Sequence, residues 1–222
     1  MFQNVQFLVE FLRNLLKIDS KLLKMQKNIS ELLMEIYFLE NIVNNRYQIN
    51  YFSFSNKVYR VLWALFYFIF FKYTPPQLFT YRSLVLKLWG SKIGANVRVY
   101  PSAKIWSPKN LSIGNGASIG PRALIYNQGH ITIGELSIIS QDVTICASTH
   151  DYTKKDHPLI TKDVTIGSKV WLCAESFVGP GVSIDDGVVL GARAVAKKNL
   201  TQWMVYDGNP CIEIKERNIE NE

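Results

Sequence analysis

The sequence predicts a mainly β protein, built as a solenoid of short parallel strands, with an α-helical N-terminal region. Over residues 93–195 an aliphatic residue recurs at every sixth position, and glycine or another small residue recurs between these positions. Such a fixed short period is typical of a solenoid. In a helix, a period of six would spread the apolar residues around the 3.6-residue turn. Before residue 93, apolar spacings of three and four indicate helices instead.

The repeat predicts one inward-pointing residue per strand, followed by a corner of the coil. Three hexapeptides make one turn of about eighteen residues, so we expect coils to start at Ile93, Ile113, Ile133, Ile166 and Ile184. Each coil buries its apolar residues only by stacking on its neighbours. The predicted inward residues are Ile93, Val99, Ile105, Ile113, Ile119, Ile125, Ile133, Ile139, Ile145, Ile166, Leu172, Val178, Ile184 and Leu190.

Residues 1–46 have helical periodicity, which is clearest between Ile29 and Val43. Two arrangements remain open for this segment. It either forms a short coiled coil of two to three heptads or packs as an amphipathic helix on its own subunit.

An aromatic and apolar run follows over residues 58–71, flanked by basic residues. It is shorter than the roughly 20 residues that a membrane-spanning helix needs. It either caps the open end of the solenoid or contacts a membrane interface, and one element could do both. Thr74-Pro75-Pro76 interrupts it, and residues 78–89 are predicted to form a second amphipathic helix with Arg82 and Lys87 on its polar side.

The charge of the chain is unevenly distributed. Residues 1–92 carry twelve Lys or Arg against five Asp or Glu, and no acidic residue occurs from Asn41 to Gly134. This asymmetry predicts an anionic surface as a partner. The aromatic residues beside it favour a peripheral membrane contact over nucleic acid, for which the chain has no base-binding motif.

These patterns divide the chain into four regions. Residues 1–56 are an N-terminal helical extension, and 57–92 are the cap or membrane-interface segment. Residues 93–199 are the solenoid domain with a loop at 148–165, and 200–222 are a C-terminal tail. The three scattered cysteines have no metal-ligand or redox spacing, and Glu10 and Arg13 interrupt the N-terminal apolar run. We therefore expect a cytoplasmic protein, peripheral on the inner face of the membrane.

Five strings within residues 57–217 are distinctive: VYPSAKIW (99–106), THDY (149–152), PLITKDVTIGSKVW (158–171), VGPGVSI (178–184) and GNP (208–210). Together they resemble the hexapeptide-repeat acyltransferases, in particular the colanic acid biosynthesis acetyltransferases. The resemblance implies a left-handed parallel β-helix, an acyltransferase enzyme that uses acetyl-CoA, and a homotrimer.

The candidate catalytic residue lies in the loop. Between Ile145 and Ile166 the chain has fifteen residues more than the repeat needs, and the THDY string lies there. Acyl transfer to a hydroxyl needs a base to take the hydroxyl proton. The resemblance implies that His150 is this general base. Asp151 is a candidate to orient His150, and Tyr152 a candidate to shape the acceptor pocket.

A further acceptor candidate is Asn127, which matches an Asn that family members place on the coil before the histidine. The alternative for Asn127 is a corner residue in the left-handed backbone conformation. For the donor, the resemblance implies binding of coenzyme A between neighbouring solenoids. The matching residues are Trp171, Ala174, Ala192, Lys197, Lys198 and Lys215. Lys197 departs from the Thr that relatives carry.

The predicted function is an O-acetyltransferase that moves an acetyl group from acetyl-CoA to a sugar hydroxyl in surface polysaccharide biosynthesis. No metal is expected. Two alternatives are a non-catalytic trimeric scaffold at the membrane and a zinc carbonic anhydrase of the same fold. The second needs three histidines facing one another, and the spacing of His130, His150 and His157 does not provide this.

Overall fold

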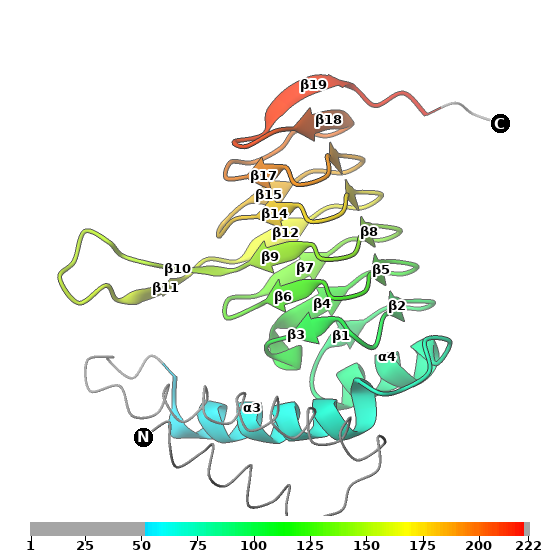
Figure 1. Cartoon of the computed structure of the whole chain (residues 1–222), viewed down its shortest axis with the longest axis vertical. Coiled ribbons are helices and arrows are strands. Elements are labelled where there is room, and N and C mark those ends of the chain that lie inside the picture. The colour runs from blue at the N-terminus through cyan, green and yellow to red at the C-terminus, as the bar shows by residue number, and fades with distance from the viewer. Residues whose placement is uncertain (1–51, 220–222) are drawn as a thin grey trace, which may run out of the picture. The chain divides into compact units, whose positions relative to one another are not determined.

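The computed structural model describes residues 52–219 (Figure 1). The alternatives predicted for residues 1–46 lie outside this range. The described chain begins with helix α3 (Phe54–Phe66), which continues into a π-helical turn η1 (Tyr67–Phe71), and then forms helix α4 (Phe79–Leu88). From Lys92 onward it is a stack of coils made of short strands.

Each coil contributes one strand to each of three parallel sheets, which form the sides of the solenoid (Figure 1). The first sheet holds β1 (Lys92–Ile93), β4 (Leu111–Ile113), β7 (Ile131–Ile133), β12 (Val164–Ile166) and β15 (Ser183–Ile184). The third holds β3 (Lys104–Ile105), β6 (Leu124–Tyr126), β9 (Thr144–Cys146), β14 (Phe177–Val178) and β17 (Val195–Ala196).

The second sheet is longer because the C-terminal strands join it. It holds β2 (Arg98–Val99), β5 (Ser118–Ile119), β8 (Ile138–Ile139), β13 (Trp171–Leu172), β16 (Val189–Leu190), β18 (Met204–Asp207) and β19 (Ile212–Glu216). The last pair, β18 and β19, is antiparallel.

The strand register confirms the predicted repeat. Ile93, Ile113, Ile133, Ile166 and Ile184 lie opposite one another in successive strands of the first sheet. All fourteen predicted inward residues are buried. In the two-residue strands, the residue before the inward one points outward, as the alternation of a β-strand requires. The core is therefore a column of aliphatic side chains along the axis of the solenoid.

The coils stack closely enough that a corner glycine has a steric role. A Cβ on Gly134 would lie 2.4 Å from the carbonyl carbon of Gly167 in the next coil. Real Cβ atoms do not approach backbone at that distance, so no larger residue fits here without moving a coil. The close contact between coils at this corner explains why glycine comes after the inward residue Ile133.

The helices cover the open end of the first coil. Trp63 is 3% exposed, and its indole Nε1 donates a hydrogen bond to the carbonyl oxygen of Ile105 at 2.8 Å. Phe71 and Leu86 are completely buried beside the same coil. These contacts show that the helical segment is an end cap.

Arg82 corrects the prediction of a polar face on the second helix. Its side chain is completely buried, whereas Lys87 is exposed as predicted. The Arg82 guanidinium donates to the carbonyl of Val99 at 2.6 Å and to the Thr74 hydroxyl at 2.8 Å. It also donates to the carbonyls of Pro75 and Pro76. The five donors of a guanidinium can satisfy several backbone carbonyls together, so Arg82 ties the proline turn to the first coil.

The opposite face of α3 and η1 remains apolar and exposed. Its residues recur at helical spacing, and we call this set the exposed apolar face: Phe54, Val58, Val61, Leu62, Leu65 and Ile69. Phe54 is 81% and Ile69 61% exposed. Within residues 52–219, no helix has the length and apolarity that crossing a membrane requires.

Candidate active site

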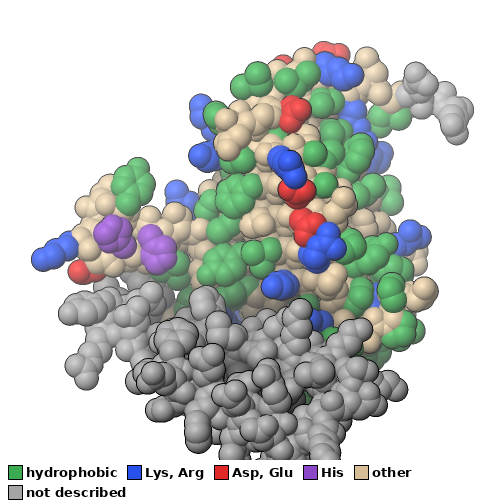
Figure 2. Space-filling model, in the orientation of Figure 1, with side chains coloured by type: hydrophobic (Ala, Val, Ile, Leu, Met, Phe, Trp, Pro, Cys, Tyr) green, Lys and Arg blue, Asp and Glu red, His purple; other side chains and the backbone are tan. Residues whose placement is uncertain are grey.

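A two-stranded arm leaves the solenoid where the repeat is interrupted (Figure 1). Strand β10 (Ser148–His150) pairs antiparallel with β11 (Leu159–Thr161), and His150 lies opposite Leu159. The arm begins after the completely buried Ala147 and rejoins the first sheet at β12. Histidine side chains lie at the surface of this arm (Figure 2).

The imidazole of His150 is held by a backbone carbonyl. Its Nδ1 lies 2.6 Å from the carbonyl oxygen of His157. A carbonyl oxygen can only accept a hydrogen bond, so Nδ1 is the donor, and in the neutral imidazole Nε2 is the nitrogen with the lone pair. Its side chain is exposed, and no residue from 52 to 219 is hydrogen-bonded to Nε2, so this nitrogen faces outward from the arm as a potential base.

The turn of the arm places this carbonyl. The backbone amide of His157 donates to the carbonyl of Lys154 at 3.0 Å, and His157 has the left-handed φ of 42°. Nothing in the sequence points to His157 as the residue that orients His150, because the contact uses its backbone and not its side chain.

Asp151 does not contact His150, contrary to the orienting role considered for it. One of its carboxylate oxygens accepts hydrogen bonds from the amide of Thr153 at 3.1 Å and from its hydroxyl at 2.6 Å. Lys154 Nζ lies 3.6 Å from the other oxygen. The hydrogen bonds from Thr153, and to a lesser extent Lys154, lower the pKa of Asp151. Asp151 thus organises the turn of the arm, and Tyr152 beside it is 84% exposed.

Asn127 does not have the exposure that an acceptor contact needs. It is completely buried, and its Oδ1 accepts from the amide of Ser107 at 3.0 Å. Its Nδ2 donates to the carbonyl of the same residue at 2.6 Å. Asn127 is also not among the residues with a left-handed φ, so the corner alternative is wrong as well. Its amide instead joins two neighbouring coils.

Trp171 lies on the outer surface of the second sheet. Its side chain is 44% exposed, and its Nε1 donates to the hydroxyl of Ser140 at 3.0 Å. Trp171 lies between Ile138 on β8 and Val189 on β16. Since Ile138 is 49% exposed, this part of the second sheet presents an apolar surface.

The other donor candidates lie at three places on the solenoid: two edges between sheets, and its C-terminal end. Ala174 and Ala192 follow β13 and β16, so they lie on adjacent coils at the edge between the second and third sheets. Lys197 and Lys198 follow β17 and lie at the edge between the third and first sheets, from which the arm also leaves. Lys215 is on β19, at the C-terminal end of the second sheet.

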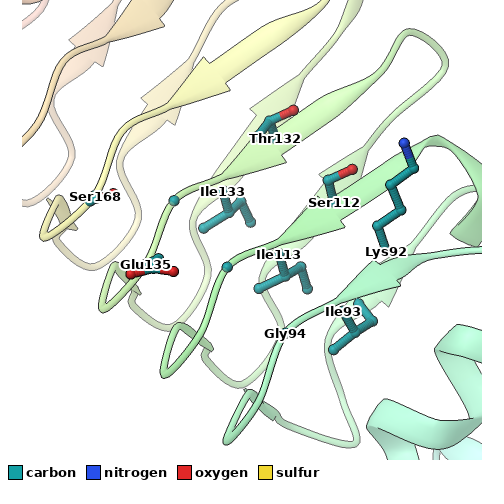
Figure 3. Close-up of a pocket in the computed structure, with 11 residues that line it drawn as sticks. Lys92, Ile93, Gly94, Ser112, Ile113, Thr132, Ile133, Glu135 and Ser168 are labelled. Atoms are coloured by element: carbon teal, nitrogen blue, oxygen red, sulfur yellow. The ribbon is translucent and has the colours of Figure 1, made fainter.

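Neither the arm nor the donor candidates line the groove shown in Figure 3. This open groove of about 530 Å³ follows the first sheet, with Lys92, Ser112, Thr132 and Glu135 among its lining residues. His130 is next to it, with Nε2 2.9 Å from the Ser112 hydroxyl. Over residues 52–219, no three His, Cys, Asp or Glu side chains lie together as a metal ion would require.

Together, the hexapeptide solenoid and the exposed histidine on an inserted arm define a hexapeptide-repeat acyltransferase. No family model matches the chain. It is, however, 39% identical over 168 residues to the protein assigned to colanic acid biosynthesis as acetyltransferase WcaF in Escherichia coli (strain K12). That match covers 76% of this chain and 92% of the relative.

Two further comparisons agree with this one. Galactoside O-acetyltransferase of Escherichia coli (strain K12) is 27% identical over 151 residues, which cover 67% of this chain and 74% of that protein. A solved structure of galactoside acetyltransferase in complex with coenzyme A superimposes with a TM-score of 0.67 at 25% identity, covering 72% of this chain and 82% of that one.

The chain belongs to the hexapeptide-repeat acetyltransferase family. It is an acyltransferase whose acyl donor is acetyl-CoA. The comparisons thus confirm the predicted family, the enzyme class and the co-substrate.

Proposed function

We propose that this protein transfers an acetyl group from acetyl-CoA to a sugar hydroxyl during the assembly of a surface polysaccharide. The observation that carries the proposal is the His150 imidazole, which is exposed on the arm with Nδ1 held by the His157 carbonyl. The sugar acceptor follows from the relatives, one assigned to colanic acid biosynthesis and one named for a galactoside.

In the proposed mechanism His150 acts as the general base. Its Nε2 takes the proton from the acceptor hydroxyl while that oxygen attacks the thioester carbonyl carbon of acetyl-CoA. The tetrahedral intermediate then breaks its carbon–sulfur bond, and the imidazolium returns the proton to the leaving thiolate. The products are the acetyl ester and coenzyme A. The hydrogen bond to His157 stabilises the imidazolium between the two steps.

A direct transfer between the two substrates agrees with the state of the cysteines. Burial raises the pKa of the Cys173 and Cys211 thiols. A raised pKa disfavours the thiolate, which is the nucleophilic form. These two residues are therefore poor candidates for carrying a covalent acetyl intermediate.

We propose that the enzyme is a homotrimer with active sites between subunits. His150 is on the arm at the edge between the third and first sheets, whereas Trp171 is on the second sheet. A site that contains both residues is therefore most easily built from two solenoids. In this arrangement Trp171, Ala174 and Ala192 of one subunit contact coenzyme A, while Lys197, Lys198 and Lys215 contribute positive charge near its phosphates. On the arm, Tyr152 contacts the acceptor.

The trimer is tested by light scattering of the purified protein, with activity measured on the same sample. The expected mass is three times 25.4 kDa. A fully active monomer would contradict the shared site. Replacing Trp171 by Ser should raise KM for acetyl-CoA, whether through the donor contact or through the interface.

We also propose a peripheral contact between α3–η1 and an anionic membrane surface, with the protein in the cytoplasm. The exposed apolar face supplies the inserted side chains; of the basic groups nearby, Lys72 directly follows η1 and Lys87 is on α4. No acidic residue from Asn41 to Gly134 opposes this attraction. The described cysteines are free thiols, as in a reducing compartment.

The function is tested by incubating the purified protein with acetyl-CoA and a panel of sugar acceptors. Release of the coenzyme A thiol and a mass increase of one acetyl group on the acceptor support the proposal. Binding of acetyl-CoA without transfer to any hydroxyl would favour a non-catalytic scaffold.

A further inference from the structure

The helical cap carries a positively charged side chain that has no anionic partner in the described part of the chain. Arg60, on α3, lies with its Cζ 3.8 Å from the ring centroid of Trp106. Within residues 52–219, no hydrogen bond or ion pair to its guanidinium is present. Burial without a counter-charge lowers the pKa of Arg60 to about 10, although the nearby Tyr126 raises it slightly. A half-buried arginine is normally paired, so this one has an unused capacity for binding an anion.

Two buried oxygen atoms near this site, one on α3 and one on a residue that contacts Tyr126, lack hydrogen-bond donors among the described residues. Asn56 is one helical turn before Arg60 on the same face of α3, and its Oδ1 is buried without a partner in residues 52–219. On the solenoid side, Gln128 donates from Nε2 to the hydroxyl of Tyr126 at 3.0 Å. The Oε1 of Gln128 is also buried and has no partner among the described residues. Buried polar atoms are normally satisfied, so each of these oxygens keeps an acceptor position that no described residue fills.

This cluster adjoins the arm that carries His150. Tyr126 lies opposite Cys146 in the adjacent coil, and its carbonyl accepts the amide of Ala147 at 3.1 Å. Strand β10 begins at the next residue and ends at His150. Figure 1 shows the arm leaving the solenoid on the side where α3 begins. A ligand held by Arg60 would therefore extend along the base of the arm toward the imidazole.

The chemistry of the cluster indicates one class of ligand. A guanidinium binds phosphate oxygens through two parallel N–H donors, and sugar hydroxyls can donate to amide oxygens. A neutral sugar would leave the Arg60 charge uncompensated. A nucleotide-linked or lipid-linked sugar would satisfy both the charge and the two oxygens.

We propose that Arg60, with Asn56 and Gln128, binds the phosphate-bearing part of the acceptor, so that the acceptor is a sugar attached to phosphate or diphosphate. This inference rests on the proposed function, since it assigns the substrate class of the same site. It adds a specificity-determining residue from the helical cap, outside the solenoid and the arm.

The test measures binding of inorganic diphosphate and of UDP-glucose by calorimetry, with the donor site filled by saturating coenzyme A. One charge-assisted bidentate contact contributes roughly tenfold to a hundredfold in affinity. The Arg60→Gln variant should therefore bind both probes at least about tenfold more weakly than the parent. Arg60→Lys keeps the charge but not the paired donors, and it should be intermediate.

The matched control is Lys104→Gln, which removes an exposed cation from β3, two residues from Trp106. It should bind both probes with nearly parental affinity. Thermal unfolding of each variant verifies that Arg60 is not simply needed for folding. Equal affinity of the parent and Arg60→Gln for both probes, or no binding by the parent, would overturn the proposal.

Two further experiments complete the test. One distinguishes lipid-linked from nucleotide-linked phosphate, and the other separates failure of the acceptor proposal from failure of the proposed function. Vesicles containing a polyprenyl-phosphate-linked glucose, compared with UDP-glucose as acceptor, distinguish lipid-linked from nucleotide-linked substrates by turnover. His150→Ala should lose transfer but keep Arg60-dependent binding of diphosphate. If His150→Ala loses transfer while Arg60→Gln retains parental binding and KM, the acceptor inference alone fails.

Discussion

The indole Nε1 of Trp63 donates a hydrogen bond to the carbonyl oxygen of Ile105, 2.8 Å away, at the first coil of the solenoid. Strand β3 ends at Ile105, and the next residue begins the turn toward the second coil. The helical segment before the solenoid is therefore part of the folded core. Only the side chains on its other face are free for a membrane.

This contact predicts a large loss of stability for Trp63→Ser. The substitution leaves a cavity at the cap and an unpaired carbonyl, and burial losses of this size cost about 3–5 kcal/mol. Urea denaturation measures the change in the free energy of unfolding. The neighbouring Leu62→Ser is the control, because Leu62 is 52% exposed and should change stability by less than about 0.5 kcal/mol. Equal stability of the two variants would contradict the cap.

The membrane contact predicts that removing exposed apolar side chains releases the protein from vesicles without unfolding it. The double variant Leu62→Ser with Ile69→Ser removes two side chains of the exposed apolar face. Flotation with anionic vesicles should recover the parent protein but not this variant, and salt should weaken the parent's binding because it screens the basic residues. A parent protein that does not float at any salt concentration would leave the helices as a cap alone.

The hydrogen bonds of Arg82 predict that replacing its guanidinium by another cation lowers the free energy of unfolding. In Arg82→Lys one ammonium group faces the carbonyls of Val99, Pro75 and Pro76 and cannot reach all of them. Each buried carbonyl left without a donor costs about 1–3 kcal/mol. Chemical denaturation should show a loss of at least about 2 kcal/mol. A Lys variant as stable as the parent would show that these hydrogen bonds contribute little.

The stacking of the coils predicts a difference between two glycines. In Gly134→Ala the new Cβ meets backbone atoms of the next coil at 2.4 Å, whereas in Gly179→Ala the nearest atom is 3.2 Å away. Overpacking typically costs about 1–3 kcal/mol, and we expect Gly134→Ala to fall in that range. Gly179→Ala should lose less than about 1 kcal/mol. The order of the two thermal midpoints checks this, and a reversed order would be evidence against tight stacking at Gly134.

The sequence could predict the solenoid because its repeat is a local rule that each coil obeys. An inward residue such as Ile133 is specified by its period alone, and its burial follows from stacking. The position of the arm was predictable for the same reason, since the insertion interrupts the period between Ile145 and Ile166.

Polar contacts were less predictable, because they depend on which atoms meet in three dimensions. Arg82 lies in an amphipathic pattern that indicates a polar face, yet four distant acceptors favour its burial. Asp151 is adjacent to His150 in sequence, but its carboxylate turns toward Thr153. The carbonyl of His157 orients His150 through the backbone, and no side-chain pattern encodes such a contact.

A variant at His157, in the turn of the arm, is the control for the proposed catalytic role of His150. His157 contributes its carbonyl and has a left-handed φ, a conformation that Asn tolerates well. His157→Asn should therefore keep the hydrogen bond to His150 and most of the activity. A loss as large as that of a His150 variant would mean that the His157 side chain takes part in the reaction.

The most direct measurement is the acetyl-transfer rate of His150→Ala at saturating acetyl-CoA and acceptor. Since a general base contributes about 10²–10⁴ to the rate, kcat should fall by that factor. The thermal midpoint should change little, because the His150 side chain is exposed on the arm. A His150→Ala enzyme that turns over at close to the parental rate would contradict the proposed mechanism.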